Sequence, residues 1–184
     1  MNTYALLMAV PAVALVACAA ATDLRGRRIP NWVTFTMVIA GLVHSIIFGA
    51  VAGPLQSTLG IAAGFALPFG MFAMGAIAGG DVKLLMGIGA WFGPLAVLQV
   101  FCIEAVVGLA MVLTQAAAQG RTRTLLRNSA LLAVNLVHVN DVGLDHVKAT
   151  GQSSRSIDRP LPYAVPVLVA VLILLAWNYT PGRV

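Results

Sequence analysis

The chain has 184 residues, of which 60% are hydrophobic and only 9% are charged, and its formal net charge is +5. This composition excludes an ordinary soluble domain, which would need far more polar surface to cover its core, and places the chain among membrane proteins. The basic residues lie in short runs beside apolar segments. We attribute them to orientation in a membrane and expect no nucleic-acid partner.

Six apolar segments follow one another along the chain. A helix needs about 20 residues to cross a membrane, because each residue adds about 1.5 Å and the hydrocarbon layer is roughly 30 Å thick. We therefore expect an all-α, polytopic integral membrane protein that forms a single membrane-embedded domain over residues 1–184. The expected helices, of which the fourth is short, lie at about residues 4–22, 33–52, 55–77, 82–92, 95–118 and 161–179.

Basic residues follow the first apolar segment and do not precede it. No Lys or Arg comes before residue 22, whereas Asp23 is followed by Arg25, Arg27 and Arg28. A signal peptide carries its positive charge in front of the apolar run. We therefore expect a retained membrane helix that ends on the cytoplasmic side.

The third and fourth segments meet at Gly79-Gly80-Asp81. A carboxylate between two apolar segments is costly, and an ionisable residue in a membrane is by default a functional-site hypothesis. The fourth segment ends at the turn signal Gly93-Pro94, and Trp91 just before it is typical of a membrane interface. Cys18 and Cys102 stand alone without ligand spacing, so we expect two small buried residues and no disulfide or metal site.

Residues 119–159 form the only sizeable polar region of the sequence. Arginines at its beginning precede an amphipathic stretch, Leu125 to Val139, which we expect to lie along the membrane surface with its apolar side chains buried. Residues 140–159 are expected to form a loop in which Asp141 and Asp145 are solvated.

The distribution of basic residues predicts the orientation of the six helices. If the loop after the first helix is cytoplasmic, every Lys and Arg except Arg183 lies on that side, as the positive-inside rule requires. The opposite orientation would place ten of the eleven basic residues outside. We therefore expect both termini outside the cytoplasm and both Asp23 and Asp81 at the cytoplasmic boundary of the membrane.

Asp23 closes the first expected helix and Asp81 opens the fourth, on the same side and at similar depth. Two facing carboxylates cannot comfortably both ionise, so they share a proton. One then acts as a base toward water while the protonated one polarises a peptide carbonyl, which is aspartyl proteolysis. The pair titrates as a unit, so neither role is assigned to either residue.

Three residues beside this pair complete the candidate site. Gly79 and Gly80 would let a substrate backbone approach the carboxylate and would allow a turn with positive φ. Lys83 is expected to extend toward lipid headgroups.

Other interpretations remain open on the residues alone. Asp81 could cap the fourth helix while Asp23 pairs with a neighbouring arginine. Together with Glu104, the aspartates could instead serve a proton or cation path in a transporter-like or channel-like protein, or both could be replaceable in a structural scaffold. For Glu104 itself we expect a hydrogen bond between helices, and for His44 a packing role with its polar atoms satisfied.

Two separated stretches resemble the prepilin peptidase family, also called type IV leader peptidases. The first runs from Thr22-Asp23-Leu24-Arg25 to Ile29-Pro30-Asn31-Trp32, and the second is Gly80-Asp81-Val82-Lys83-Leu84-Leu85 with Gly89-Ala90-Trp91-Phe92-Gly93 after it. The late Pro162-Tyr163-Ala164-Val165-Pro166 is similar to the last helix of that family. The chain looks most like the small members associated with Flp/Tad pili, although a pseudopilin system is also compatible.

The resemblance implies an aspartyl endopeptidase of the bacterial inner membrane. Such an enzyme removes short leader peptides from prepilins or pseudopilins at the cytoplasmic face, in contact with membrane lipid and the pilus assembly machinery. By matching positions, Asp23 and Asp81 would be its catalytic pair.

The sequence departs from the family pattern in two places. Ala78 replaces the first glycine of the family's G-x-G-D motif, a change between small residues that we expect to be tolerated. Larger members carry a methyltransferase domain, often with paired C-x-x-C motifs, between the first two helices, where this chain has only a short arginine loop. The resemblance therefore implies no methyl transfer, no zinc and no other cofactor.

Overall fold

The computed structural model describes residues 3–48, 53–74, 77–137 and 162–179, and within these ranges the chain is all-helical. The prediction of an all-α fold is thus confirmed. The helices are α1 (Thr3–Gly26), α2 (Asn31–Phe48), α3 (Pro54–Ala73), α4 (Gly79–Phe92), α5 (Pro94–Ala118), α6 (Thr122–Val137) and α9 (Ala164–Tyr179).

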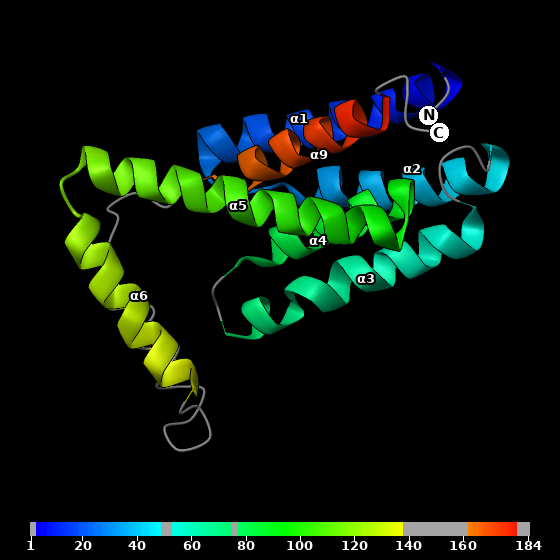
Figure 1. Cartoon of the computed structure of the whole chain (residues 1–184). Helices are drawn as coiled ribbons and strands as arrows, with labels where there is room; N and C mark the ends of the chain where they lie inside the picture. Colours follow the sequence, from blue (N-terminus) through cyan, green and yellow to red (C-terminus); the bar gives the residue numbers. More distant parts are fainter. Residues whose placement is uncertain (1–2, 49–52, 75–76, 138–161, 180–184) are drawn as a thin grey trace.

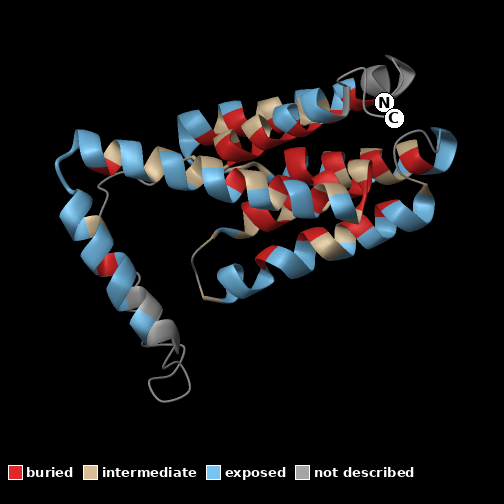
Figure 2. Cartoon of the chain, viewed as in Figure 1, coloured by how far each residue is buried: buried red, intermediate tan, exposed pale blue. Residues whose placement is uncertain are grey.

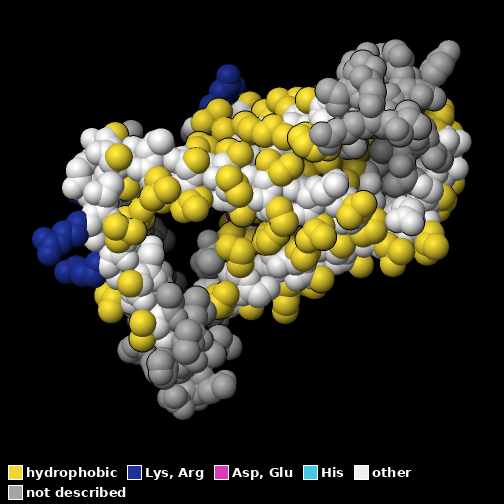
Figure 3. Space-filling model, viewed as in Figure 1, with side chains coloured by type: hydrophobic (Ala, Val, Ile, Leu, Met, Phe, Trp, Pro, Cys, Tyr) yellow, Lys and Arg dark blue, Asp and Glu magenta, His cyan; other side chains and the backbone are white. Residues whose placement is uncertain are grey.

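Four helices, α1, α2, α3 and α5, are long and apolar enough to cross a membrane. The structure does not confirm about six spans, because α4 has 14 residues and α9 has 16, which leaves both below the usual length. Hydrophobic side chains cover much of the face of the bundle that Figure 3 shows. Large apolar side chains such as Ile46 (68% exposed) and Leu55 (70%) face outward, as expected where lipid is the solvent.

The short helix α4 lies at the centre of the bundle and contacts α1, α2, α3 and α5 (Figure 1). The other helices bury one side and expose the other, whereas α4 is buried along nearly its whole length (Figure 2). Helix α9 packs between α1 and α5. The end of α1 and the beginnings of α4 and α9 gather at the same end of the bundle, at the left in Figure 1.

Local sequence signals explain several helix boundaries. Pro54 and Pro94 occupy the first positions of α3 and α5, where a missing N–H costs nothing. Gly93 separates α4 from α5 with a φ of 83°, a left-handed value that favours glycine. The structure differs from our expectation in two places that matter for the site: α1 continues to Gly26, and α4 already begins at Gly79.

Glycines let α3 and α4 approach each other at backbone distance. Gly60 and Gly64, one helical turn apart on α3, face α4. A Cβ atom on Gly60 would collide with the backbone of Gly89, and one on Gly64 would lie 2.5 Å from the carbonyl oxygen of Leu85. Small residues at this spacing are a common device for close helix packing in membranes. The Ser57 hydroxyl adds a buried hydrogen bond of 2.6 Å to the carbonyl of Ala90 across the same interface.

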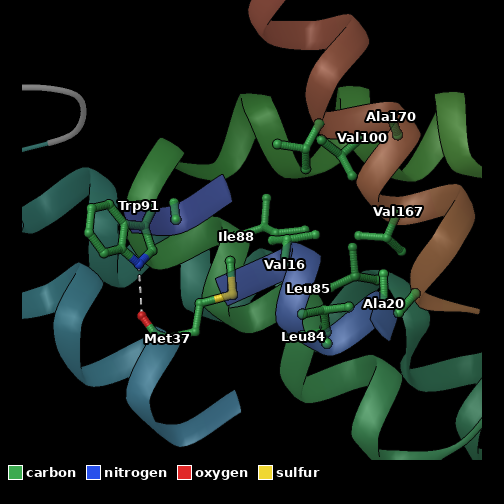
Figure 4. Close-up of a cluster of buried hydrophobic side chains, with 14 of the residues drawn as sticks. Val16, Ala20, Met37, Leu84, Leu85, Ile88, Trp91, Val100, Val167 and Ala170 are labelled. Atoms are coloured by element: carbon green, nitrogen blue, oxygen red, sulfur yellow. Dashed lines mark hydrogen bonds between the residues drawn. The ribbon is translucent and has the colours of Figure 1, made fainter. Parts of the chain in front are cut away.

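The apolar core is built around α4. Side chains of α1, α2, α5 and α9 converge on it (Figure 4), including Val16, Ala20, Met37, Leu84, Leu85, Ile88, Val100, Val167 and Ala170. The prediction that Trp91 lies at a membrane interface is wrong. Its indole is only 3% exposed, and its N–H donates to the carbonyl of Met37 at 2.9 Å, because α2 closes over the end of α4.

Two other expectations about single residues need correction. Cys102 is exposed on the outer face of α5, and Cys18 is half-buried, so the two thiols are not both buried; both are free. His44 does pack, with its ring centroid 4.8 Å from that of Trp91, but its Nε2 atom is buried without a hydrogen-bond partner. Its polar atoms are therefore not all satisfied.

The polar region contains helix α6, which leaves the end of α5 and extends away from the bundle (Figure 1). The amphipathic helix expected over Leu125 to Val139 thus begins three residues earlier, at Thr122. The expected loop at 140–159, with Asp141 and Asp145, lies outside the described residues.

The contact between α3 and α4 gives a stability prediction. We expect Gly89→Ala to lower the free energy of unfolding by about 1–3 kcal/mol, because the added methyl forces two backbones apart. Gly70→Ala is the matched control: Gly70 also lies in a helix, but a Cβ there meets nothing within 4 Å. The control should be neutral or stabilise by about 0.5–1 kcal/mol. Unfolding of both variants in detergent measures the difference, and equal stabilities would contradict this packing.

Candidate active site

Asp23 lies in the last turn of α1 and is 5% exposed. Its Oδ2 atom accepts a hydrogen bond of 3.0 Å from the backbone N–H of Ala164, the first residue of α9. The first N–H groups of a helix have no partner within the helix, and a carboxylate there is favoured by the helix dipole. Asp23 is thus held by the beginning of α9 and not by a neighbouring arginine.

Asp81 lies in the first turn of α4 and is 8% exposed. Its Oδ2 atom accepts the backbone N–H of Ala78 at 3.0 Å. This bond is half of a capping box, the other half being absent because the Ala78 side chain has no acceptor. Asp81 therefore caps α4, as expected if its role were only structural. The same hydrogen bond fixes the direction of the carboxylate.

The structure brings Asp23 and Asp81 to the same end of the bundle. No hydrogen bond joins the two carboxylates, whose Oδ2 atoms each accept a different backbone N–H. They are nevertheless close enough to repel each other. Burial raises the pKa of Asp81 from its ordinary value of 3.8 to about 6; the Ala78 N–H opposes this rise and the negative charge of Asp23 adds to it.

Gly79 and Gly80 form the first turn of α4 and are not a separate flexible turn. Neither has a positive φ; among the described glycines only Gly93 and Gly120 do. A Cβ on Gly79 would lie 3.5 Å from the Phe72 ring, an ordinary contact. The helix itself therefore does not require glycine at Gly79, and the expectation of a positive-φ turn is wrong.

Lys83 follows one turn after Gly79 and gives α4 a polar link to α2. Its Nζ atom donates to the side-chain oxygen of Asn31 at 3.0 Å and lies 5.4 Å from the centroid of the Phe35 ring. Both partners belong to the first turns of α2. Lys83 thus helps to fix the beginning of α2 beside Asp81.

A hydrogen-bonded pair that the sequence did not reveal lies close to the aspartates. Tyr163, the residue before α9, donates from its hydroxyl to Oε1 of Glu104 in α5. The expected hydrogen bond between helices at Glu104 is thus confirmed. The negative charge of Asp81 acts on both residues, so they belong to the same electrostatic neighbourhood. In the sequence, Glu104 stood out as the only acidic residue of its apolar segment. No spacing pattern identified Tyr163 as its partner.

An apolar groove of about 350 Å³ lies along the first two turns of α4. Helices α2, α3 and α4 each contribute to its walls: Thr34, Phe35, Val38, Phe65, Phe72, Gly79, Val82, Lys83 and Met86. Gly79 and Val82 lie in the same turn of α4 as Asp81, which is not itself one of the lining residues. No group of three or more potential metal ligands occurs in the part of the chain that the structure describes.

Comparison with known proteins identifies the family. The model of the type IV leader peptidase family matches residues 10–113, more than half of the chain. The chain belongs to the type IV leader peptidase family. The matched region contains Asp23, Asp81 and Glu104, whereas Tyr163 and Ala164 lie beyond it. The resemblance drawn from the two sequence stretches is therefore confirmed.

Part of the chain is similar to a preflagellin peptidase of Methanocaldococcus jannaschii. It is 42% identical over 72 residues, which cover 37% of this chain and 30% of the relative. The match thus spans less than a third of that protein. No solved structure matches the chain.

The raised pKa of Asp81, which lies outside the four candidate membrane spans, gives a prediction for stability. The folded state binds this proton more tightly than the unfolded chain, so the contribution of Asp81 to stability is complete below pH about 4 and is lost as the pH rises through about 6. Asn does not titrate. As the pH rises from about 4 to 7, we therefore expect the free energy of unfolding of Asp81→Asn to increase by about 2–3 kcal/mol relative to that of wild type. Asn retains an oxygen that can accept the Ala78 N–H. Unfolding in detergent at both pH values measures the gain, and a difference independent of pH would refute it.

Proposed function

We propose that this protein is an aspartyl endopeptidase that removes leader peptides from prepilin-like or pseudopilin substrates at the cytoplasmic face of the inner membrane. The observation that carries the proposal is the pair of buried carboxylates, from different helices, that interact at one end of the bundle. Basic side chains are exposed at the same end, where α1 ends and α6 begins (Figure 3). By the positive-inside rule, we expect this end to face the cytoplasm.

Each aspartate accepts one backbone N–H at the beginning of a helix, Asp23 from Ala164 of α9 and Asp81 from Ala78 before α4. Asp81 holds its proton more tightly than an ordinary carboxyl group. We therefore assign the base to Asp23 and the acid to Asp81 within a pair that shares one proton.

In the proposed reaction, the carboxylate of Asp23 takes a proton from a water molecule while the water oxygen bonds to the scissile carbonyl carbon. Asp81 gives its proton to the carbonyl oxygen. Collapse of the resulting tetrahedral intermediate breaks the C–N bond, and the leaving nitrogen takes the proton held by Asp23. The second hydroxyl proton of the intermediate returns to Asp81, which restores the pair.

The apolar groove along the first two turns of α4 supports a substrate with an apolar segment next to the scissile bond. Its walls are hydrophobic except for Thr34 and Lys83, and its position would place such a segment against α2 and α3. Membrane lipid would surround the remaining faces of the substrate helix. We expect the product to pass to the pilus assembly machinery.

Replacing either aspartate tests the proposal. We expect Asp23→Asn and Asp81→Asn each to reduce leader removal by about 10²–10⁴-fold, because neither amide can transfer the required proton. Each variant is co-expressed with a prepilin-like protein encoded beside it, and the shift in substrate mass is followed. Asp141→Asn, in the polar region of the sequence, is the control for loss of one negative charge and should cleave normally.

Normal cleavage by either aspartate variant would exclude the paired-carboxylate mechanism. Cation or proton flux in liposomes that disappears in Asp81→Asn, with no cleavage of any prepilin by wild type, would support the transporter interpretation. A scaffold predicts that both aspartates are replaceable without effect.

Gly79→Ala tests whether this glycine serves the substrate. The fold has room for the methyl group, since its nearest neighbour is the Phe72 ring at 3.5 Å and φ is not positive. We therefore expect unchanged stability but a KM raised about five- to tenfold. The methyl narrows the groove and should weaken substrate binding by roughly 1 kcal/mol. Gly53→Ala, where a Cβ also has open space, is the control. An unchanged KM would remove Gly79 from the substrate site.

A further inference from the structure

Two consecutive residues at the beginning of α9 are anchored to two different helices. The backbone N–H of Ala164 donates to Asp23 of α1, and the hydroxyl of Tyr163 donates to Glu104 of α5. The start of α9 therefore lies between a proposed catalytic carboxylate and a second buried carboxyl group. Any movement of Tyr163 would also move the N–H that holds Asp23.

Glu104 is an unusual residue for its position. It is 5% exposed, lies in an otherwise uncharged helix, and its Oε2 atom is buried without a hydrogen-bond partner. A carboxyl group inside a membrane helix is costly. A tie between α5 and α9 alone would not require one, because both helices already contribute apolar side chains, among them Val100 and Val167, to the same core cluster (Figure 4).

We propose that Glu104 and Tyr163 are positioning residues that fix the beginning of α9 and thereby the direction of the Asp23 carboxylate. This inference rests on the proposed function. The Ala164 N–H is a single, directional donor, and it keeps its place only if the residue before it is held. An error of about 1 Å in the placement of a catalytic group can cost up to about 10²-fold in rate.

The neighbourhood of Asp81 supports the same assignment. Its charge acts on both Glu104 and Tyr163, which belong to α5 and to the residue before α9, whereas the groove is lined by residues of α2, α3 and α4. The pair donates to and accepts from no residue of the groove. Its loss should therefore change the chemical step and leave binding of an apolar substrate segment intact.

Three variants separate positioning from simple helix packing. Tyr163→Phe removes only the hydroxyl, Glu104→Ala removes the acceptor, and Glu104→Gln retains a carbonyl oxygen that can accept the same bond. We expect kcat for leader cleavage to fall about tenfold or more in Tyr163→Phe and Glu104→Ala, with KM within about twofold of wild type. Glu104→Gln should retain most of the activity. The double variant should be no slower than the slower single variant, because both changes break one bond.

Gln115→Ala is the matched control. Gln115 also lies in α5 and has a buried side-chain oxygen without a partner, but it is three turns beyond Glu104. Its kcat should equal that of wild type. Unfolding in detergent is measured for every variant, and Tyr163→Phe keeps the experiment decisive if Glu104→Ala does not fold.

Equal kcat values for wild type and folded Tyr163→Phe would overturn the inference, as would additive losses in the double variant. A rise in KM at constant kcat would also overturn it, because that result indicates a binding role. The proposed function is judged separately, by the loss of cleavage in Asp81→Asn: if wild type cleaves and Asp81→Asn does not, failure of the Tyr163 prediction affects the positioning pair alone.

Discussion

The close approach of α3 to α4 is the constraint on which the rest of this structure depends. A 14-residue helix can occupy the centre of the bundle only if its neighbours come near enough to cover it. Gly60 and Gly89 allow this, because neither has a side chain to keep the two backbones apart. The position of α4 in turn fixes Asp81, whose carboxylate is held against the N–H of Ala78 in the first turn.

Helix beginnings provide the polar partners for the buried acids. Asp81 is bound by an N–H at the start of α4, and Asp23 by one at the start of α9. Such N–H groups have no partner within their own helix, so accepting from them satisfies both groups at once. This arrangement lets a bundle with an apolar exterior hold two interacting carboxylates at one end. The same beginning of α9 carries Tyr163, which connects the site to Glu104.

The proposed chemistry conflicts with stability at Asp81. Burial beside a second carboxylate raises its pKa, so the ionised form weakens the folded state as the pH rises. If the residue only capped the helix, an uncharged side chain that accepts the same N–H would give a more stable fold at neutral pH. The proposed catalytic role accounts for a carboxyl group at this cost, whereas capping alone does not require one.

Features set by nearby residues were predictable from the sequence. The lengths of the apolar segments indicated an all-helical membrane protein, Gly93-Pro94 indicated a helix boundary, and charge placement put Asp23 and Asp81 at the same end. The errors at Gly79 and Trp91 have a common origin. Both residues were judged from their neighbours in sequence, as a glycine turn and as an interfacial aromatic, whereas packing around α4 extends the helix to Gly79 and buries the indole.

By itself, the sequence determined the helices, their family and the two aspartates, because apolar length, proline and glycine act locally and the family motifs are contiguous. Only the tertiary structure decided what these aspartates bind. The donor to Asp23 is 141 residues away, and the partner of Glu104 is 59 residues away. Contacts over such distances depend on how α9 packs between α1 and α5. Short-range patterns in the sequence do not predict that packing.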